Sequence, residues 1–565
     1  MANKVLIVGG VAGGASVAAR VRRLDEHAEV TMFERGPHVS FSNCALPFFL
    51  SRTISESDSL VLMNPTQFRK QYNINAVVNS EVVEIKSEEH KVVVKNVLTG
   101  ETFEQEYDKL FLSPGANPIL PRSIKGINSN HVFPVRNVPD IVKIDNYIKE
   151  NNVKDVAVIG GGFIGLEVME NLEMAGLNVT LIEAADQIMT PLDKDMAQIL
   201  QKEIIENNVN LIVSDGLAEI QADKVITASG KVVKSQMVIM AIGVVPEVSL
   251  AVASGVELGV TGGIKVDHNY RTNLKDVYAV GDAIETYCQI IRKPTRLTLA
   301  GPAQRQARGA ADNMYGRTVQ NKGVIGSSCV KIFNLNGATT GLNEKQCKDA
   351  GIEYDFVYII PGDRVGLIPT SNPIHLKLIY EVPTGKILGA QAIGKGNIVK
   401  RVDVVATMIT MAGTLDDLKE LELCYSPMFS TAKDPLNHAA LVALNVLNGD
   451  FKQVKVSEVR DIFENGGYII DVREPNEYAE GHIINAVNIP MSEFRQRLDE
   501  IPTDKPVYVH CRSAQRSYNV ATALGHLGYD NIYNISGSYM GICYNQYFED
   551  VQLNRDKIVT DYNFK

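Results

Sequence analysis

One pattern occurs twice in the chain: an apolar strand, a glycine-rich turn, a helix and a second strand that ends in glutamate. The first copy has its turn at Gly9–Gly14 and ends at Glu34, and the second has its turn at Gly160–Gly165 and ends at Glu183. This arrangement is typical of a βαβ dinucleotide-binding unit. A single glycine-rich turn occurs in many proteins for steric reasons alone, but two complete copies predict two parallel α/β domains that each bind a dinucleotide.

Each turn should hold a pyrophosphate on the N-terminus of its helix, where backbone N–H groups and the helix dipole favour negative charge. The first turn departs from the usual fingerprint because Val11 stands at the middle glycine, whereas the second has the full spacing. Glu34 and Glu183 are expected to accept hydrogen bonds from ribose hydroxyls. A carboxylate at Glu183 would repel a 2′-phosphate, so the sequence favours NADH over NADPH.

The 565 residues are too many for one core and predict roughly three to five domains. A net charge of −10 argues against a nucleic-acid-binding protein, which needs a basic face. We find no signal peptide and no apolar run of about 18 residues, so we expect a cytoplasmic protein that is not in a membrane. The seven cysteines are scattered and odd in number, which favours a reducing compartment and cysteines that act as thiolates.

Cys44 lies soon after the first unit, in the segment 40–47. A cysteine at this place can lie over the ring of a flavin held by that unit, and its thiolate can attack a sulfur–sulfur bond. The alternative is a buried structural cysteine, a common fate of a free cysteine.

Cys511 follows the predicted strand 507–510 and stands in a loop at the start of a helix. Inward-pointing N–H groups, the helix dipole, Arg512 and Arg516 should stabilise a thiolate or a persulfide anion there. A phosphatase loop also combines cysteine and arginine and is the competing interpretation. We expect both Cys44 and Cys511 to lie in electropositive settings.

The motifs resemble two known families. The segment 40–47 (Ser-Phe-Ser-Asn-Cys-Ala-Leu-Pro) and the segment 272–282 are similar to the active-site signature and the second FAD motif of single-cysteine flavin disulfide reductases, close to the coenzyme A-disulfide reductases. The segments 468–490 and 507–517 resemble the structural signature and the active loop of a rhodanese domain. The fusion resembles NADH-dependent persulfide reductases.

The resemblance implies an α/β fold with two Rossmann-like dinucleotide-binding domains, an α+β dimerisation domain and a C-terminal α/β rhodanese domain. The expected ranges are 1–150 and 271–322 for the FAD-binding domain, 151–270 for the NAD-binding domain, 323–447 for the dimerisation domain and 453–565 for the rhodanese domain. It also implies a homodimer with FAD, NADH (or NADPH) as reductant, and coenzyme A as substrate or bound ligand.

The site residues that this resemblance implies fall into four groups. The catalytic residues are Cys44, Cys511 and Tyr425, and the sulfur-transfer loop adds Arg512, Ser513, Ala514, Gln515 and Arg516. The FAD contacts are Gly9, Val11, Ala12, Gly13, Gly14, Glu34, Arg35, Asn43, Val82, Ser113, Gly115, Gly281, Asp282, Ala300 and Ala303. The NAD contacts are Gly160, Gly162, Phe163, Ile164, Gly165, Glu183 and Gly243. The coenzyme A contacts are Ser16, Arg20, Arg23, Ser40, Asn43 and Lys433, although a solvated helix face would equally explain the two arginines.

The implied activity is NAD(P)H-dependent reduction of coenzyme A persulfide, polysulfide or coenzyme A disulfide through Cys44, with Cys511 carrying sulfane sulfur. Leu367 and Ile368 stand where coenzyme A-disulfide reductases have a second active-site tyrosine, which favours the smaller persulfide. An NADH oxidase or peroxidase that cycles the cysteine through sulfenic acid is one alternative, but Ala12 stands where those enzymes tend to have a histidine. A flavin redox sensor with a docking rhodanese domain is another.

Overall fold

The computed structural model describes residues 3–564, which form two compact units. The first unit contains the residues up to Asp186 together with Ile212–Val324. The second contains Gln187–Leu211 together with the residues from Ile325 onward. One helix of the range expected for NAD binding therefore packs with the C-terminal half of the chain.

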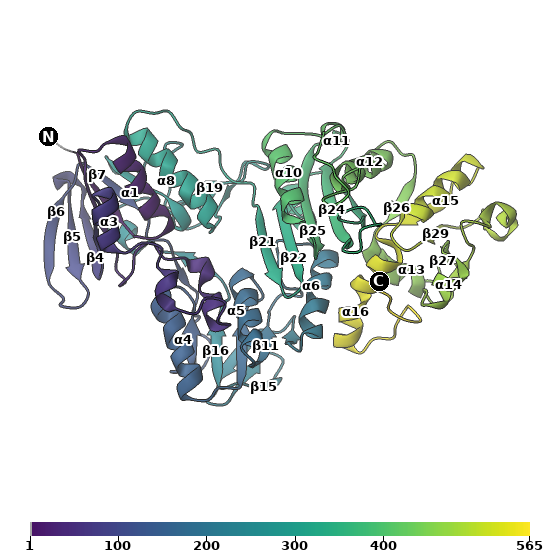
Figure 1. Ribbon diagram of the computed structural model, residues 1–565, viewed down its shortest axis with the longest axis horizontal. Helices are drawn as coiled ribbons and strands as arrows, with labels where there is room; N and C mark the ends of the chain where they lie inside the picture. The colour runs from purple at the N-terminus through teal and green to yellow at the C-terminus, as the bar shows by residue number, and fades with distance from the viewer. Residues whose placement is uncertain (1–2, 565) are drawn as a thin grey trace. The chain divides into compact units, whose positions relative to one another are not determined.

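A five-stranded parallel sheet of order β18-β7-β1-β2-β3 forms the first part of the first unit. Its central strand β1 is apolar and buried, as expected for a parallel strand covered on both faces. Helices α1 and α8 pack against each other in this part (Figure 1). The bounds are β1 Lys4–Val8, α1 Ala12–Leu24, β2 Glu29–Phe33, α2 Pro47–Leu50, α3 Pro65–Tyr72, β3 Asn75–Val77, β7 Lys109–Leu112, β18 Val277–Ala279 and α8 Ala300–Met314.

The second glycine-rich turn belongs to another five-stranded sheet, of order β12-β11-β10-β16-β9. Strand β10 pairs in parallel with β11 and with β16, so the second βαβ unit is formed as the sequence predicted. The bounds are β9 Val132–Pro134, α4 Val138–Glu150, β10 Asp155–Ile159, α5 Phe163–Met174, β11 Asn178–Ile182, β12 Asn210–Ile212 and β16 Met237–Met240.

Smaller antiparallel sheets complete the first unit. Strands β4-β5-β6 and β13-β14-β15 form three-stranded sheets, and β8 pairs with β17 and β19 with β20. The bounds are β4 Ser80–Lys86, β5 Lys91–Asn96, β6 Thr102–Glu106, β8 Ala116–Pro118, β13 Leu217–Ile220, β14 Lys224–Thr227, β15 Val232–Lys234, β17 Val244–Pro246, α7 Ser249–Ala253, β19 Thr286–Tyr287 and β20 Pro294–Thr295.

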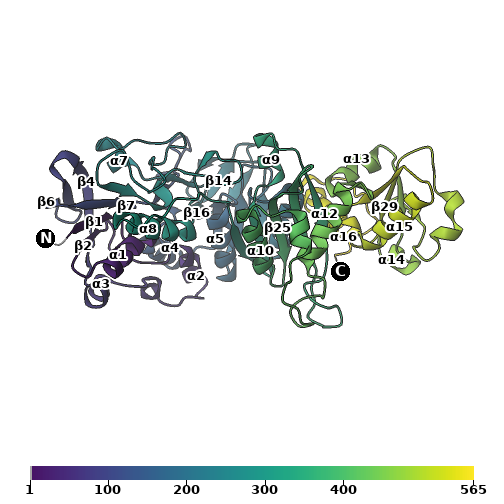
Figure 2. The ribbon, with the colours of Figure 1, turned by 90° about the horizontal axis from the view of Figure 1, so that it is seen from above.

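The second unit begins with an antiparallel sheet of order β21-β22-β25-β24-β23. Strands β24 and β25 are buried along almost their whole length, so both faces of the sheet are covered. Helix α10 packs on β25, beside which it lies in Figure 2, and on β22, and α12 packs on β23 and β24. The bounds are α6 Lys194–Glu206, β21 Ser328–Ile332, β22 Leu335–Gly341, α9 Glu344–Ala350, β23 Tyr354–Ile359, β24 Ile374–Glu381, β25 Ile387–Gly394, α10 Val399–Thr410, α11 Leu415–Lys419 and α12 Pro435–Leu447.

The C-terminal part of the second unit is a parallel sheet of order β26-β30-β29-β27-β28 with helices around it. Its last helix, α16, packs on α6. There the Lys202 ammonium lies 4.1 Å from the centroid of the Phe564 ring. The bounds are β26 Lys452–Val454, α13 Val459–Glu464, β27 Tyr468–Asp471, α14 Pro475–Ala479, β28 Val487–Asn488, β29 Val507–His510, α15 Gln515–His526, β30 Ile532–Ile535 and α16 Ser538–Leu553.

These sheets confirm the expected fold class: two Rossmann-like parts, an α+β part and a C-terminal α/β part. Among the described residues, no helix combines the length and the apolar character that a membrane span requires.

Candidate active sites

The first glycine-rich turn is sterically closed to larger residues at three positions. Gly9 has a φ of +93°, a conformation that L side chains rarely adopt. A Cβ on Gly14 would lie 1.8 Å from the Gly9 carbonyl oxygen, and a Cβ on Gly13 would lie 2.3 Å from Ser113 Oγ. The close packing of the helix on the strand therefore depends on these glycines, and Val11 is accommodated as the residue that precedes α1.

The second turn repeats this geometry. Gly160 has a φ of +107°, and a Cβ on Gly165 would lie 1.8 Å from the Gly160 carbonyl oxygen. A Cβ on Gly162 would meet no atom within 4 Å, so the backbone there faces open space. Within residues 3–564, no side chain caps the N-terminus of α1 or of α5, which leaves N–H groups of both helices available to an anion.

The two glutamates at the strand ends are held in the same way. The Glu34 carboxylate accepts hydrogen bonds from the Gly10 and Gly36 N–H groups, both at 2.8 Å. The Glu183 carboxylate accepts from the Gly161 N–H at 2.6 Å and the Ala185 N–H at 2.7 Å. These bonds fix each carboxylate beside its turn. Because a carboxylate has about four acceptor positions, each can still accept hydrogen bonds from ribose hydroxyls. The residues at both turns therefore fit a dinucleotide.

The other predicted cofactor contacts are spread over several elements of the first unit. Gly281 donates its N–H to Gln306 on α8 at 2.8 Å, and a Cβ on Gly281 would lie 3.4 Å from Ser113 Oγ. Burial raises the pKa of Asp282 to about 6. Arg35 pairs with Glu81 at 3.3 Å. Other predicted contacts lie as follows: Val82 is buried in β4, Ala300 and Ala303 lie on α8, Phe163 and Ile164 begin α5, and the Gly115 and Gly243 carbonyls accept N–H groups of the chain.

Cys44 lies in the short 3-10 helix Asn43–Ala45, directly before α2, and is exposed. Partial burial, and then the carboxylates of Glu167 and Asp282, raise the pKa of its thiol. The expectation of an electropositive setting for Cys44 is therefore wrong for the protein's own groups. The sequence could not reveal this, because Glu167 and Asp282 come from distant parts of the chain.

Glu167 was not identified from the sequence. It lies on α5, and burial together with the charge of Glu170 raises its pKa to about 7. One turn further along α5, Asn171 accepts a hydrogen bond of 2.6 Å from Ser51, which follows α2. The available signal was a carboxylate in the first turns of the helix that directly follows the glycine-rich turn.

The predicted coenzyme A contacts have different surroundings. Arg20 donates to the buried Asp312 through Nε at 2.9 Å, so this guanidinium is held in an ion pair. Arg23 is exposed and lies over the Tyr72 ring at 5.9 Å. The four other predicted contacts are held locally or exposed: Ser16 Oγ donates to the Ala12 carbonyl, Asn43 donates to the Arg136 carbonyl, Ser40 has a φ of +48°, and Lys433 is exposed. Of the two arginines, Arg23 is the one with an accessible charge.

Tyr425 belongs to the second unit and has 51% of its surface exposed. Leu367 in the same unit is 89% exposed. The position where related enzymes were expected to have a second tyrosine therefore presents an apolar side chain to the surface.

Cys511 directly follows strand β29, begins the loop that leads to α15, and is only 1% exposed. Its backbone N–H donates to Ser538 Oγ at 3.1 Å, and its carbonyl accepts from the Tyr539 N–H at 3.0 Å. The Ser517 hydroxyl lies 3.6 Å from the Cys511 sulfur, within hydrogen-bond distance. Helix α15 begins at the end of this loop, as the predicted strand–loop–helix arrangement requires, and the first residues of α16 are hydrogen-bonded to the loop.

The arginines of the loop differ in their partners. Arg516 makes two hydrogen bonds to Glu477, at 2.6 and 2.7 Å, and these bonds together with the Cys511 sulfur raise its pKa. Arg512 and Gln515 are exposed, whereas Ser513 and Ala514 are half-buried. Ala514 has a φ of +73° directly before α15. Glu477 was not identified from the sequence, although it lies in the segment that resembles the rhodanese signature.

A buried ion pair, Arg473–Asp471, lies next to the strand that leads into the Cys511 loop. Arg473 donates to both oxygens of the Asp471 carboxylate and to the Gly481 carbonyl. The Arg473 guanidinium also lies 4.2 Å from the centroid of the Tyr539 ring. Burial lowers the pKa of His510, which keeps this imidazole neutral next to Cys511. The base of the loop is thus rigidly held.

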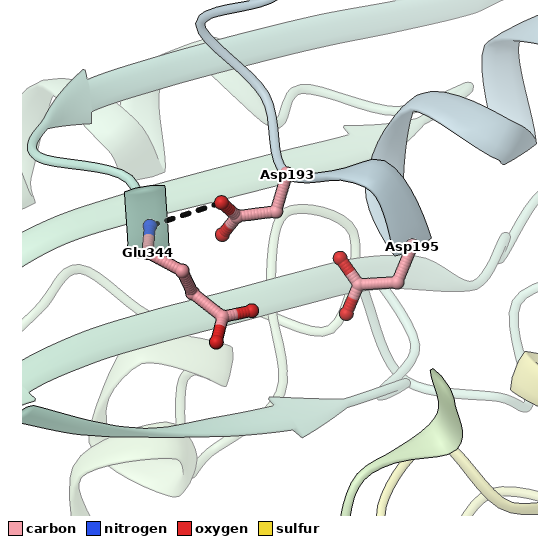
Figure 3. A group of neighbouring side chains, drawn as sticks. All are labelled: Asp193, Asp195 and Glu344. Carbon is pink, nitrogen blue, oxygen red and sulfur yellow. Dashed lines mark hydrogen bonds between the residues drawn. The ribbon is translucent and has the colours of Figure 1, made fainter. Parts of the chain in front are cut away.

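Three carboxylates of the second unit, those of Asp193, Asp195 and Glu344, converge in the core (Figure 3). The ammonium of Lys377 lies among them, 2.6 Å from Glu344, 2.9 Å from Asp195 and 3.1 Å from Asp193. Lys377 is fully buried, and a second lysine, Lys455, contacts Glu344 at 3.1 Å. A lysine ammonium therefore occupies the position that a metal ion would need, and the cluster is an ion-pair centre.

Three family models match consecutive parts of the chain. Residues 3–307 match the family described as pyridine nucleotide-disulphide oxidoreductase, and residues 327–435 match its dimerisation domain. Residues 455–544 match the rhodanese-like domain.

Three similar proteins cover most of the chain. The chain is 35% identical over 436 residues to the coenzyme A disulfide reductase of Staphylococcus epidermidis. The match covers 77% of this chain and 98% of that protein. The crystal structure of reduced Bacillus anthracis CoADR-RHD is 44% identical with a TM-score of 0.93, and the match covers 96% of this chain and 98% of that one. A NAD-dependent persulfide reductase from A. fulgidus is 33% identical with a TM-score of 0.90, and the match covers 95% and 99%.

Proposed function

Because the chain belongs to the pyridine nucleotide-disulphide oxidoreductase family and carries a rhodanese-like domain, we propose that it reduces coenzyme A persulfide or related polysulfides with NADH. The observation that carries the proposal is the pair of cysteine sites on one chain. Cys44 lies beside a dinucleotide-binding turn, and Cys511 lies in a loop whose N–H, hydroxyl and guanidinium groups suit anionic sulfur. The names of two similar proteins, a coenzyme A disulfide reductase and a persulfide reductase, support the substrate class.

Two dinucleotides fit the two turns. FAD would be held by the first turn with Glu34, Ser113 and Asp282, and NADH by the second turn with Glu183. When bound, the flavin supplies a two-electron relay between the nicotinamide and the sulfur. The match to the dimerisation domain supports a homodimer, in which Tyr425 would act as a hydrogen-bond donor near the Cys44 sulfur.

The chemistry at Cys44 is thiol–disulfide exchange. Its thiolate attacks the inner sulfur of a persulfide R–S–SH, forms a mixed disulfide with R, and releases HS⁻. Two electrons and one proton then return the Cys44 thiolate and release R–SH. Cys511 would accept sulfane sulfur from a donor and pass it to the coenzyme A thiol. The apolar Leu367 supports the persulfide over the bulkier disulfide, because no second tyrosine is present to protonate a departing thiolate.

The two cysteines can be tested separately by following NADH oxidation with preformed coenzyme A persulfide, with coenzyme A disulfide, and with coenzyme A plus thiosulfate. Cys44→Ser should lose reduction of all three while its flavin is still reduced by NADH, because only the second half-reaction needs the thiolate. Cys511→Ser should lose only the thiosulfate-dependent reaction. Near wild-type turnover by Cys44→Ser would refute the role of Cys44. Rapid NADH oxidation with oxygen alone would favour the oxidase instead.

A further inference from the structure

The hydroxyl of Ser517 faces the sulfur of Cys511 from the first turn of α15. Ser517 is fully buried. Its Oγ lies 3.6 Å from Cys511 Sγ, 3.2 Å from the Ala514 carbonyl oxygen and 3.5 Å from Ser538 Oγ. A serine hydroxyl has one proton, so it can donate to only one of these acceptors at a time.

Ser538 holds the backbone on the other side of the same sulfur. Its Oγ accepts the Cys511 N–H at 3.1 Å, and the residue is fully buried with a φ of +49° at the start of α16. The N–H groups of Tyr539 and Met540 donate to the carbonyls of Cys511 and Arg512. Because these bonds fix the Cys511 backbone, the distance from Ser517 Oγ to the sulfur is set by two helix starts.

Which acceptor the Ser517 hydroxyl donates to depends on the charge of the Cys511 sulfur. A neutral thiol is a weak acceptor, so the proton is better used by the Ala514 carbonyl. A thiolate is a strong acceptor, and a hydrogen bond to a charged group is about twice as strong as one between neutral groups. We propose that Ser517 is a further catalytic residue of the sulfur-transfer loop, whose hydroxyl turns from the Ala514 carbonyl to the Cys511 sulfur when that sulfur becomes anionic.

This role rests on the proposed sulfur transfer at Cys511 and acts in its export step. An acceptor thiolate R–S⁻ attacks the outer sulfur of the Cys511 persulfide. The new bond joins R–S to that outer sulfur, the old sulfur–sulfur bond breaks, and its electron pair stays on Cys511 Sγ as a thiolate. Negative charge thus develops on the atom that Ser517 faces. A donor aimed at the place where charge develops stabilises the transition state more than the ground state.

The test compares hydroxyl removal at two buried positions of α15. Ser517→Ala removes the donor, and Thr522→Val is the matched control because the buried Thr522 hydroxyl has no hydrogen-bond partner among the described residues. The rate of alkylation of Cys511 by iodoacetamide is measured against pH, with mass spectrometry of the Cys511 peptide. We expect the midpoint of the profile to rise by about one pH unit in Ser517→Ala and to stay unchanged in Thr522→Val.

Transfer of sulfur from thiosulfate to a thiol should fall about tenfold in Ser517→Ala as well. Ser517→Thr keeps the hydroxyl and should keep the wild-type midpoint. Ser517→Cys keeps the side-chain volume but has a weaker donor, so it should raise the midpoint of the Cys511 alkylation profile. This variant replaces Ser517→Ala in the test if Ser517→Ala fails to fold. An unchanged midpoint in Ser517→Ala or Ser517→Cys would overturn the proposal, as would an equal rise in Ser517→Thr. A wild-type protein that transfers no sulfur would instead contradict the proposed function, while the alkylation midpoints would still report on Ser517.

Discussion

Replacing Lys377 by methionine removes the one cation that is buried at the centre of the Asp193, Asp195 and Glu344 cluster. The three carboxylates have oxygen atoms within 4.8 Å of one another, and Lys377 is 0% exposed. Breaking a buried ion pair on one side costs about 3–5 kcal/mol, because the remaining charge is uncompensated. Of the three carboxylates, Lys455 pairs with that of Glu344, so it compensates the lost charge in part.

The expected result is a lower unfolding temperature for the second unit. With about 2–4 °C per kcal/mol for a domain of this size, the melting temperature should fall by about 6–20 °C. Burial already raises the pKa of Asp193 in the wild type, and the charge of Lys377 opposes that rise, so removing Lys377 should raise this pKa further above its value in the unfolded chain. Stability from such groups is present at low pH and lost as pH rises, so the loss should be larger at pH 8 than at pH 5.

Differential scanning calorimetry of both proteins at the two pH values provides the measurement. Lys345→Met is the matched control, because Lys345 pairs with Asp349 on the surface and exposed pairs contribute about 0–1 kcal/mol. Adding Asp195→Asn to Lys377→Met should recover part of the lost melting temperature, because it removes one of the uncompensated carboxylates. A Lys377→Met protein that melts within about 2 °C of the wild type at both pH values would refute the reasoning.

Three other predictions follow from the dinucleotide and coenzyme A sites. Glu183→Ala should narrow the preference for NADH over NADPH, measured as the ratio of the two kcat/KM values, and a wild-type preference for NADPH would contradict the role of Glu183. Glu167→Gln should move the alkylation midpoint of Cys44 to lower pH, because a carboxylate that raises the pKa of Cys44 is removed; an unchanged or higher midpoint would show that Glu167 does not act on the thiol. Arg23→Ala should raise the KM for coenzyme A persulfide with little change in kcat, because its charge is accessible. Arg20→Ala should mainly lower the melting temperature, because Arg20 neutralises the buried Asp312. The reverse pattern would assign coenzyme A binding to Arg20.

Several structural features could be predicted from the sequence because their causes are local. Gly14 and Gly165 are closed by the carbonyl oxygens of Gly9 and Gly160 in their own turns, and Gly9 and Gly160 themselves have positive φ. Gly13 is closed instead by Ser113, which the fold brings from the end of β7. The family and the fold class followed from such units. The strand–loop–helix around Cys511 was likewise visible as a short continuous motif.

Side-chain environments needed the tertiary structure. The sequence suggested an electropositive setting for Cys44, but Glu167 and Asp282, which come from other elements, raise the pKa of its thiol. Arg20 looked like an exposed helical arginine, yet α8 brings Asp312 against it.

The family, the fold class and the glycine-rich cofactor turns could be inferred from short segments, because the conformational freedom of glycine and the alternation of strands and helices are local properties. Which charges and hydroxyls meet, as in the Lys377 cluster and at the Cys511 sulfur, depends on how remote segments pack. The physical reason is that the free energy of an ionisable group depends on its burial and on neighbours within a few ångströms, and folding draws those neighbours from segments that are remote in sequence.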